Sequence, residues 1–134
     1  MQIVFMLALA LHVMSGVFWA GSTFVLARTG DGRLAMSLFG PQMGAATVAV
    51  LSGAVLWYLF HGTGYFGTQE QALAVGAIAA IVAAGVQGIS VGRSRRATAQ
   101  EAVASTLRQA VRGERLAAGL LAITVVAMAI ARVV

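Results

Sequence analysis

Four long apolar runs, separated by short polar segments, dominate the pattern of this chain. They cover residues 3–27, 41–60, 71–92 and 114–133, and each is close to the ~20 residues that a helix needs to cross ~30 Å of hydrocarbon. We interpret each run as a helix, because the backbone groups of an open sheet would stay unpaired in lipid. The pattern predicts one all-α domain over residues 1–134, an antiparallel four-helix transmembrane bundle.

Local signals set the expected helix ends. Pro41 stands where a first helical residue can lack its N–H without cost, so we expect the second helix to begin there. Thr68, followed three residues later by Gln71, predicts a capping box at the start of the third helix. Thr98 and Glu101 repeat this spacing before a stretch that runs to about residue 112. That stretch has apolar residues on one side and arginines on another, so we expect a short amphipathic segment at the cytoplasmic membrane surface before the fourth span.

Composition agrees with a membrane protein. The 134 residues are 60% hydrophobic and 10% charged, which is more apolar surface than one small soluble core can bury. The net charge of +5 would suggest nucleic acid in a soluble protein, but the cations flank apolar spans, so we expect no nucleic-acid partner and contact with membrane lipid instead. No Lys or Arg precedes the first run, which is also longer than a signal-peptide core, so we expect a span there. The chain has no cysteine, which excludes disulfides and thiolate sites.

The arginines predict the orientation. Arg132 is near the last residue, and the other eight flank or occupy the first and third inter-helix loops: Arg28, Arg33, Arg93, Arg95, Arg96, Arg108, Arg112 and Arg115. Positively charged loops stay in the cytoplasm, so we expect loops one and three there and both termini in the periplasm of a bacterial inner membrane.

His12 is the one ionisable residue well inside a predicted span. A buried ionisable side chain is costly and is a functional candidate by default. Three interpretations stay open: a neutral imidazole bonded to a neighbouring hydroxyl or carbonyl, a haem or metal ligand, and a proton relay. Its helix face is shared by Ala8, Ser15, Gly16 and Trp19. The small neighbours three and four residues away leave a groove in which a porphyrin or another helix could lie.

The remaining titratable residues offer His12 no partner. Every acidic residue is placed outside the predicted spans or at their ends, which argues against proton pumping: Asp31, Glu70, Glu101 and Glu114. His61 ends the second span, whereas the residue level with His12 is nearer Val50 or Leu51. The two imidazoles are therefore too far apart to share a metal ion, and His61 alone is a weak candidate metal or quinone contact.

Small residues recur at every fourth position of the third span and predict close helix packing, within the bundle, in a homo-oligomer, or against a larger membrane complex. They are Gly76, Ala80, Ala84, Gly88 and Gly92. Ala45, Ala49 and Gly53 repeat this spacing on the second span.

Residues 11–21 read LHVMSGVFWAG, a histidine followed seven residues later by Trp-x-Gly. This resembles the first-helix pattern of small bacterial membrane proteins related to the copper-resistance protein D domain. Later parts of the chain look like landmarks of four-helix members of that group: residues 53–65, residues 85–96 ending in VGRSRR, and residues 128–132. The resemblance implies a four-helix inner-membrane protein with copper handling or b-type haem as its themes. Small membrane-bound protoporphyrinogen oxidases are similar at the first-helix histidine.

These observations favour a small accessory protein that binds a b-type haem through His12, and no catalytic set that would mark an enzyme is visible. With a single histidine in this chain as ligand, the sixth ligand of the haem iron would come from a second copy or from a partner, or would be absent. The alternative is a structural subunit without a cofactor, packed against a larger membrane complex. A copper-handling protein is the weaker alternative, because no metal-rich outer loop or Met ladder accompanies the two histidines.

Overall fold

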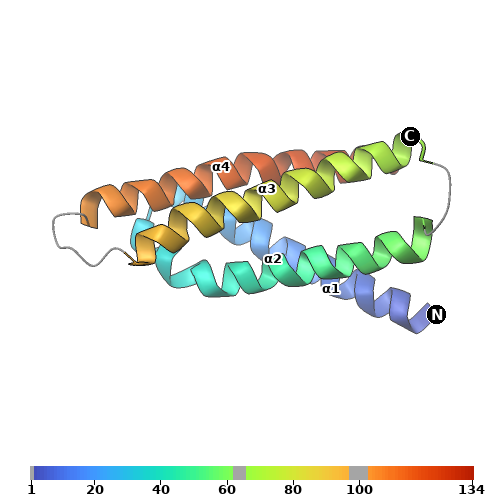
Figure 1. Cartoon of the computed structure of the whole chain (residues 1–134), viewed down its shortest axis with the longest axis horizontal. Coiled ribbons are helices and arrows are strands. Elements are labelled where there is room, and N and C mark those ends of the chain that lie inside the picture. The colour runs from blue at the N-terminus through green and yellow to red at the C-terminus, as the bar shows by residue number, and fades with distance from the viewer. Residues whose placement is uncertain (1, 62–65, 97–102) are drawn as a thin grey trace.

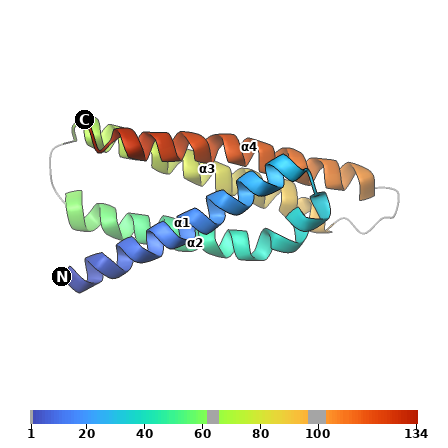
Figure 2. The same cartoon turned by 180° about the vertical axis from the view of Figure 1, so that it is seen from behind.

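A computed structural model of the chain describes residues 2–61, 66–96 and 103–134, which contain helices and no strand. The helices are α1 (Gln2–Thr29), α2 (Gly32–His61), α3 (Thr68–Arg96) and α4 (Val103–Ile130). All four are long and apolar enough to cross a membrane. They alternate in direction, so the chain ends lie at one end of the bundle, here called the terminal end (Figures 1 and 2). The opposite end, where α1 meets α2 and α3 approaches α4, is the arginine end.

A tight turn joins α1 to α2 at the arginine end. Gly30 adopts a φ of 66°, the left-handed conformation that commonly ends a helix, and its N–H bonds the carbonyl of Leu26. Asp31 caps α2: its Oδ1 accepts the N–H groups of Arg33 and Leu34 at 2.9 and 3.0 Å. This cap places the start of α2 nine residues before Pro41, the predicted first residue. The prediction was wrong because proline is tolerated inside apolar helices, and here α2 continues through it.

The other two helices also begin earlier than the patterns predicted. Glu70 accepts the N–H of Gly67 at 2.8 Å, so the capping interaction of α3 lies one residue before the predicted Thr68–Gln71 pair. From residue 103 onward, the expected surface segment forms the first turns of α4 instead, while Thr98 and Glu101 lie outside the described residues. These turns pack inward: Ala110 is fully buried, and the Ser94 hydroxyl of α3 donates to the carbonyl of Thr106.

The core is made largely of alanine, and the large apolar side chains lie outside. One buried cluster joins all four helices through Trp19 and Leu121 and five alanines, which are Ala46, Ala49, Ala80, Ala83 and Ala117. Large residues such as Val17, Leu51 and Ile78 are more than 60% exposed. Small residues inside and large apolar residues outside suit a bundle whose solvent is lipid, where close backbone approach holds helices together.

The small-residue stripe of α3 divides between two directions. A Cβ at Gly76 would lie 3.3 Å from the carbonyl of Thr124, and one at Gly92 would lie 3.4 Å from Phe39. Ala80 is buried and Ala84 is partly buried against the same core. A Cβ at Gly88, in contrast, would meet nothing within 4 Å. The stripe therefore packs inside the bundle at several positions, and Gly88 faces open space.

Candidate functional site

Every helix contributes a polar side chain to one buried cluster in the half of the bundle nearer the arginine end. Its members are Trp19 and Thr23 from α1, Gln42 from α2, Gln87 from α3 and Glu114 from α4. Four of them are completely buried, and Trp19 is 2% exposed. Polar groups this deep in an apolar bundle are costly unless they bond one another, so their side-chain hydrogen bonds determine what the cluster can do.

Gln87 is the centre of the cluster. Its Oε1 accepts the indole N–H of Trp19 at 2.7 Å. Its Nε2 donates to Thr23 Oγ1 at 3.0 Å and to Glu114 Oε2 at 2.9 Å. The Gln42 amide joins from α2 by donating to Thr23 Oγ1 at 3.2 Å. Because these bonds cross between all four helices, the cluster fixes the rotation of each helix about its own axis.

Glu114 is the acidic member, and it has few partners. Its Oε2 accepts from Gln87, whereas its Oε1 and the Oε1 of Gln42 are buried with no hydrogen-bond partner in the described part of the chain. Arg112 and Arg115 are close in sequence but exposed, so their side chains face away from the core. An acid at such a position is a functional candidate, because burial of an unpaired charge costs several kcal/mol.

The prediction that every acidic residue lies outside the spans or at their ends was wrong for Glu114. The sequence placed it at the boundary of the fourth span because arginines surround it. In the helix, the same turns direct Arg112 and Arg115 outward and Glu114 inward. The signal that could have found this cluster is the presence of Gln42 and Gln87 inside apolar runs.

His12 lies about two helical turns from the cluster, toward the terminal end. Its Nδ1 is 2.8 Å from the carbonyl oxygen of Ala49 on α2, close to the level of Val50 that the helix geometry predicted. A carbonyl only accepts, so Nδ1 carries the proton in this bond and a neutral imidazole keeps its lone pair on Nε2. Gly53 lies against the ring: a Cβ there would be 3.0 Å from Cε1. Among the described residues, none offers Nε2 a hydrogen bond.

The residues predicted to surround His12 do not form one site with it. Trp19 belongs to the polar cluster through its indole N–H. Ser15 donates back to the carbonyl of Leu11 in its own helix at 2.5 Å. Gly16 is open, since a Cβ there would meet nothing within 4 Å. Ser15 also donates to the backbone carbonyl of His12 at 3.3 Å, so it bonds the backbone of α1 and not the imidazole, and Gly16 leaves open space.

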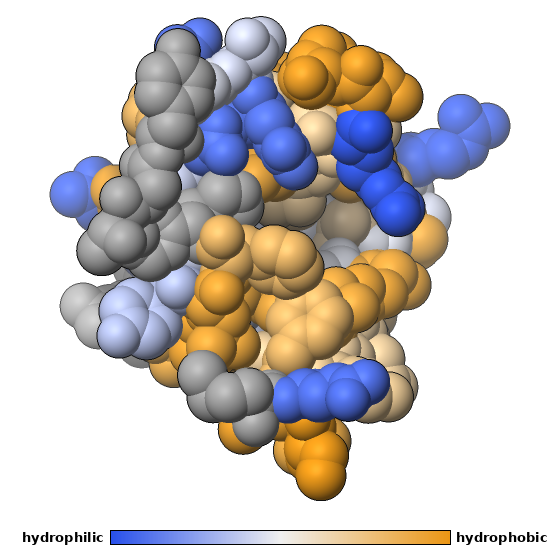
Figure 3. Space-filling model, turned by 90° about the vertical axis from the view of Figure 1, so that its right-hand side faces the viewer, coloured by the Kyte–Doolittle hydropathy of each residue, from blue (hydrophilic) through white to orange (hydrophobic). Residues whose placement is uncertain are grey.

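The two halves of the bundle differ in how the helices associate. Toward the terminal end the contacts run within pairs: Phe5 stacks edge-on against Phe60 between α1 and α2, at 5.0 Å between centroids. Between α3 and α4, Thr124 donates to the carbonyl of Gly76 at 3.0 Å. The pairs diverge toward this end (Figures 1 and 2), and the end face is hollowed in its middle, with apolar side chains below the hollow and hydrophilic ones along its upper rim (Figure 3).

Metal-binding geometry is limited in the described residues, which hold no group of three or more His, Cys, Asp or Glu side chains placed to share an ion. His61 ends α2 eight residues beyond Gly53, or about 12 Å along the helix at ~1.5 Å per residue. Its side chain lies outside the described structure.

Comparison with models of protein families, with curated proteins and with solved structures finds no match for this chain. The functional argument therefore depends on the two buried polar features, His12 and the cluster around Gln87 and Glu114.

Proposed function

We propose that this chain is a small multi-pass accessory protein of a bacterial inner membrane that binds one b-type haem through Nε2 of His12. The observation that carries the proposal is the bond between His12 Nδ1 and the carbonyl of Ala49. Histidines that bind metals usually donate their other ring N–H to a carbonyl or carboxylate, which fixes the tautomer and orients the ring. His12 has this arrangement.

The surroundings of His12 support the fit of a flat macrocycle. The imidazole is half-buried on the inner face of α1, where Ser15 and Gly16 leave open space. The helix pairs diverge on this side, and apolar side chains form one side of the hollow at the end face (Figure 3). This apolar side supports the fit of a largely apolar macrocycle.

His12 is the residue that would hold the haem, through Nε2. A haem held by this one histidine would keep a coordination position for a small ligand, for a second His12 of another copy, or for a partner's side chain. Gly53 lets the imidazole lie close to α2. We place the arginine end in the cytoplasm because eight arginines gather at that end, and both termini therefore in the periplasm.

An absorption spectrum tests the proposal. Full-length protein, expressed with added haem and purified in detergent, is expected to show a Soret band that is lost in His12→Ala and kept in His61→Ala, which removes the other imidazole. Circular dichroism of each variant establishes that the helices remain. Folded wild-type protein without a Soret band, or a band that survives in His12→Ala, contradicts haem binding at this position.

A structural subunit is the second candidate, favoured by two glycines of α3 that have open space beside them in the described part of the chain. A Cβ at Gly85 or Gly88 would meet nothing within 4 Å. Small residues on an open helix face permit close approach of another membrane helix. A partner that packs there should co-purify with wild type and with His12→Ala, but not with Gly88→Leu. Gly119→Leu on α4 is the control, since Gly119 is also open; equal loss in both variants contradicts a seam on α3.

A further inference from the structure

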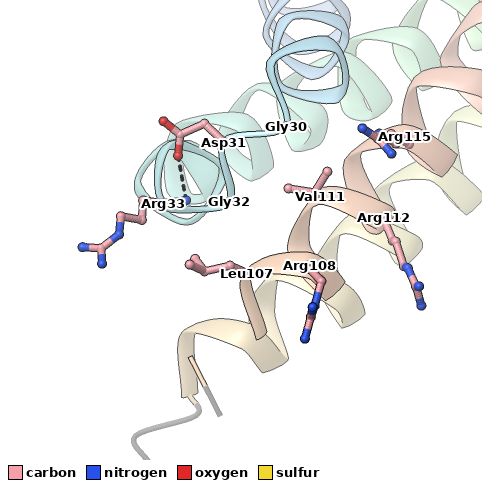
Figure 4. Close-up of a pocket in the computed structure, with 9 residues that line it drawn as sticks. All are labelled: Gly30, Asp31, Gly32, Arg33, Leu107, Arg108, Val111, Arg112 and Arg115. Carbon is pink, nitrogen blue, oxygen red and sulfur yellow. Dashed lines mark hydrogen bonds between the residues drawn. The ribbon is translucent and has the colours of Figure 1, made fainter. Parts of the chain in front are cut away.

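An open pocket of about 560 Å³ lies at the arginine end, between the α1–α2 turn and the first turns of α4. The turn contributes Gly30, Asp31, Gly32 and Arg33, and α4 contributes Leu107, Val111 and three arginines (Figure 4). Close packing fixes one wall, because a Cβ at Gly32 would lie 2.7 Å from the carbonyl of Leu107. The pocket is therefore a consequence of how α2 starts against α4.

The charge in this pocket is strongly positive. Four arginines and one aspartate line it, which leaves a formal charge of +3, and the cations are Arg33, Arg108, Arg112 and Arg115. Asp31 is engaged elsewhere, since its Oδ1 accepts two backbone N–H groups of α2. No carboxylate in the described residues pairs with these guanidinium groups at salt-bridge distance. The pocket thus has four cationic side chains against one carboxylate, which already caps α2.

The arginines that face the pocket come from successive turns of one helix. Arg108 and Arg112 project in a similar direction, and Arg115 extends toward the turn at Gly30 (Figure 4). Arg115 Nε also donates to the carbonyl of Ala27 at 3.3 Å, which holds this side chain at the end of α1. Guanidinium groups bind phosphate oxygens through paired N–H donors. An array of three arginines on one helix therefore suits a phosphate group.

We propose that this pocket binds the phosphate group of an anionic membrane lipid. The pocket lies where four apolar helices end, at the level expected for lipid headgroups. The adjoining surface toward the middle of the bundle is apolar: Val25 on α1 is 56% exposed and Leu116 on α4 is 63% exposed. A lipid can therefore place its phosphate among the arginines and its acyl chains along α1 and α4. Among the described residues that line the pocket, none has an aromatic side chain on which a nucleotide base would stack.

Lipid titration of the full-length protein tests this site. Phosphatidylglycerol is added to the protein in neutral detergent, and bound lipid is counted by native mass spectrometry. The double variant Arg108→Gln/Arg112→Gln should lose about 30-fold in affinity, since one near-surface cation contributes roughly a fivefold factor. The matched control Arg28→Gln/Arg93→Gln removes the same charge from the same end of the bundle, at two exposed residues that do not line the pocket, and should retain most of the affinity.

Two further measurements separate the outcomes. Thermal melts followed by circular dichroism establish that both double variants stay folded, and the haem spectrum should be the same in both. Inorganic phosphate at millimolar concentration should not displace the lipid; displacement would identify a site for free phosphate and overturn the lipid proposal. Equal losses in the two double variants would overturn the pocket in favour of diffuse charge, and so would a wild-type protein that binds phosphatidylglycerol no better than phosphatidylcholine.

Discussion

The two halves of this bundle are held together by different kinds of contact. Near the arginine end, one hydrogen-bonded cluster centred on Gln87 connects side chains from all four helices. Near the terminal end, the His12–Ala49 bond joins α1 to α2 and the Thr124–Gly76 bond joins α3 to α4, while Trp57 of α2 lies against Phe66, just before α3, with 6.3 Å between ring centroids. The first half fixes the arrangement of four helices, and the second leaves two pairs that diverge.

This difference suggests a division of labour. Apolar contacts between membrane helices specify orientation weakly, because lipid tails are as apolar as the side chains. A buried polar cluster is specific, because each rotated helix would leave its donors and acceptors unpaired. With the fold fixed at one end, the other end is less constrained, which is what the proposed haem site beside His12 requires.

The largest expected effect is on stability when Gln87 is replaced by leucine. Gln87→Leu removes three hydrogen bonds at once and leaves the Trp19 N–H and Glu114 Oε2 buried without their partner. We expect a loss of about 2 to 3 kcal/mol, since each intramembrane bond contributes on average ~0.6 and at most ~1.7 kcal/mol. Unfolding in mixed micelles of increasing SDS content, followed by circular dichroism, measures it. Gln109→Leu is the control because Gln109 is exposed on α4; similar losses in both would mean that the cluster does not hold the helices.

The next effect concerns close packing between α3 and α4. A Cβ at Gly113 would overlap Ser90 Oγ and lie 2.6 Å from Ser90 Cβ, so Gly113→Ala forces the two helices apart. Overpacking of this kind costs about 2 kcal/mol. Gly119→Ala, six residues along the same helix, meets nothing within 4 Å and should leave stability unchanged or slightly raised. The same unfolding titration compares them, and equal stability of the two variants would contradict the crossing at Gly113.

Much of the fold follows from the sequence because four runs long and apolar enough to cross a membrane leave few choices. A run of about 20 apolar residues must be helical, and short loops make neighbours antiparallel. The helix boundaries were less predictable. The start of α2 depends on the cap at Asp31. The start of α4 depends on contacts with residues distant in sequence: Ala110 is buried with residues of the other helices, and Leu107 packs against Gly32 of α2. Hydrophobicity alone places a boundary at the first charge, whereas helices that extend beyond the apolar run carry charges on their outward faces.

The site was only partly predictable for a related reason. His12 was identifiable, since an isolated histidine in an apolar run is conspicuous, and its level on α2 followed from helix rise. The acceptor that binds it is a backbone carbonyl, which no side-chain pattern records. The cluster around Gln87 required knowledge of how four helices are rotated, and the arginines beside Glu114 obscured its inward direction.

A smaller effect on stability, with a larger one on haem binding, is expected from Gly53→Ala. Its Cβ would lie 3.0 Å from Cε1 and 3.2 Å from Nδ1 of His12, so the imidazole must move by a few tenths of an ångström. We expect at most about 1 kcal/mol of destabilisation, because only the less constrained half adjusts. The Soret absorption per protein should fall, whereas Gly16→Ala, an open position on α1, should retain it. Unchanged haem content in Gly53→Ala would show that ring position is not critical.

The smallest effect is expected from Ser52→Ala, and it tests which group orients His12. Ser52 Oγ lies 3.5 Å from His12 Nδ1 and donates to the carbonyl of Val48 at 2.6 Å, whereas Ala49 O lies 2.8 Å from Nδ1. If the carbonyl orients the ring, Ser52→Ala should change stability by only a few tenths of a kcal/mol, since no short bond to the ring is lost.

The tautomer of His12 provides the measurement for this variant. A carbonyl can only accept, so it requires a protonated Nδ1, whereas a serine hydroxyl could also donate to an unprotonated Nδ1. Nitrogen-15 chemical shifts of labelled histidine distinguish a protonated from an unprotonated ring nitrogen, with His61→Ala protein used to remove the second signal. We expect a protonated Nδ1 in both the wild type and Ser52→Ala. A proton that moves to Nε2 in either protein would remove the lone pair on which ligation of a haem depends.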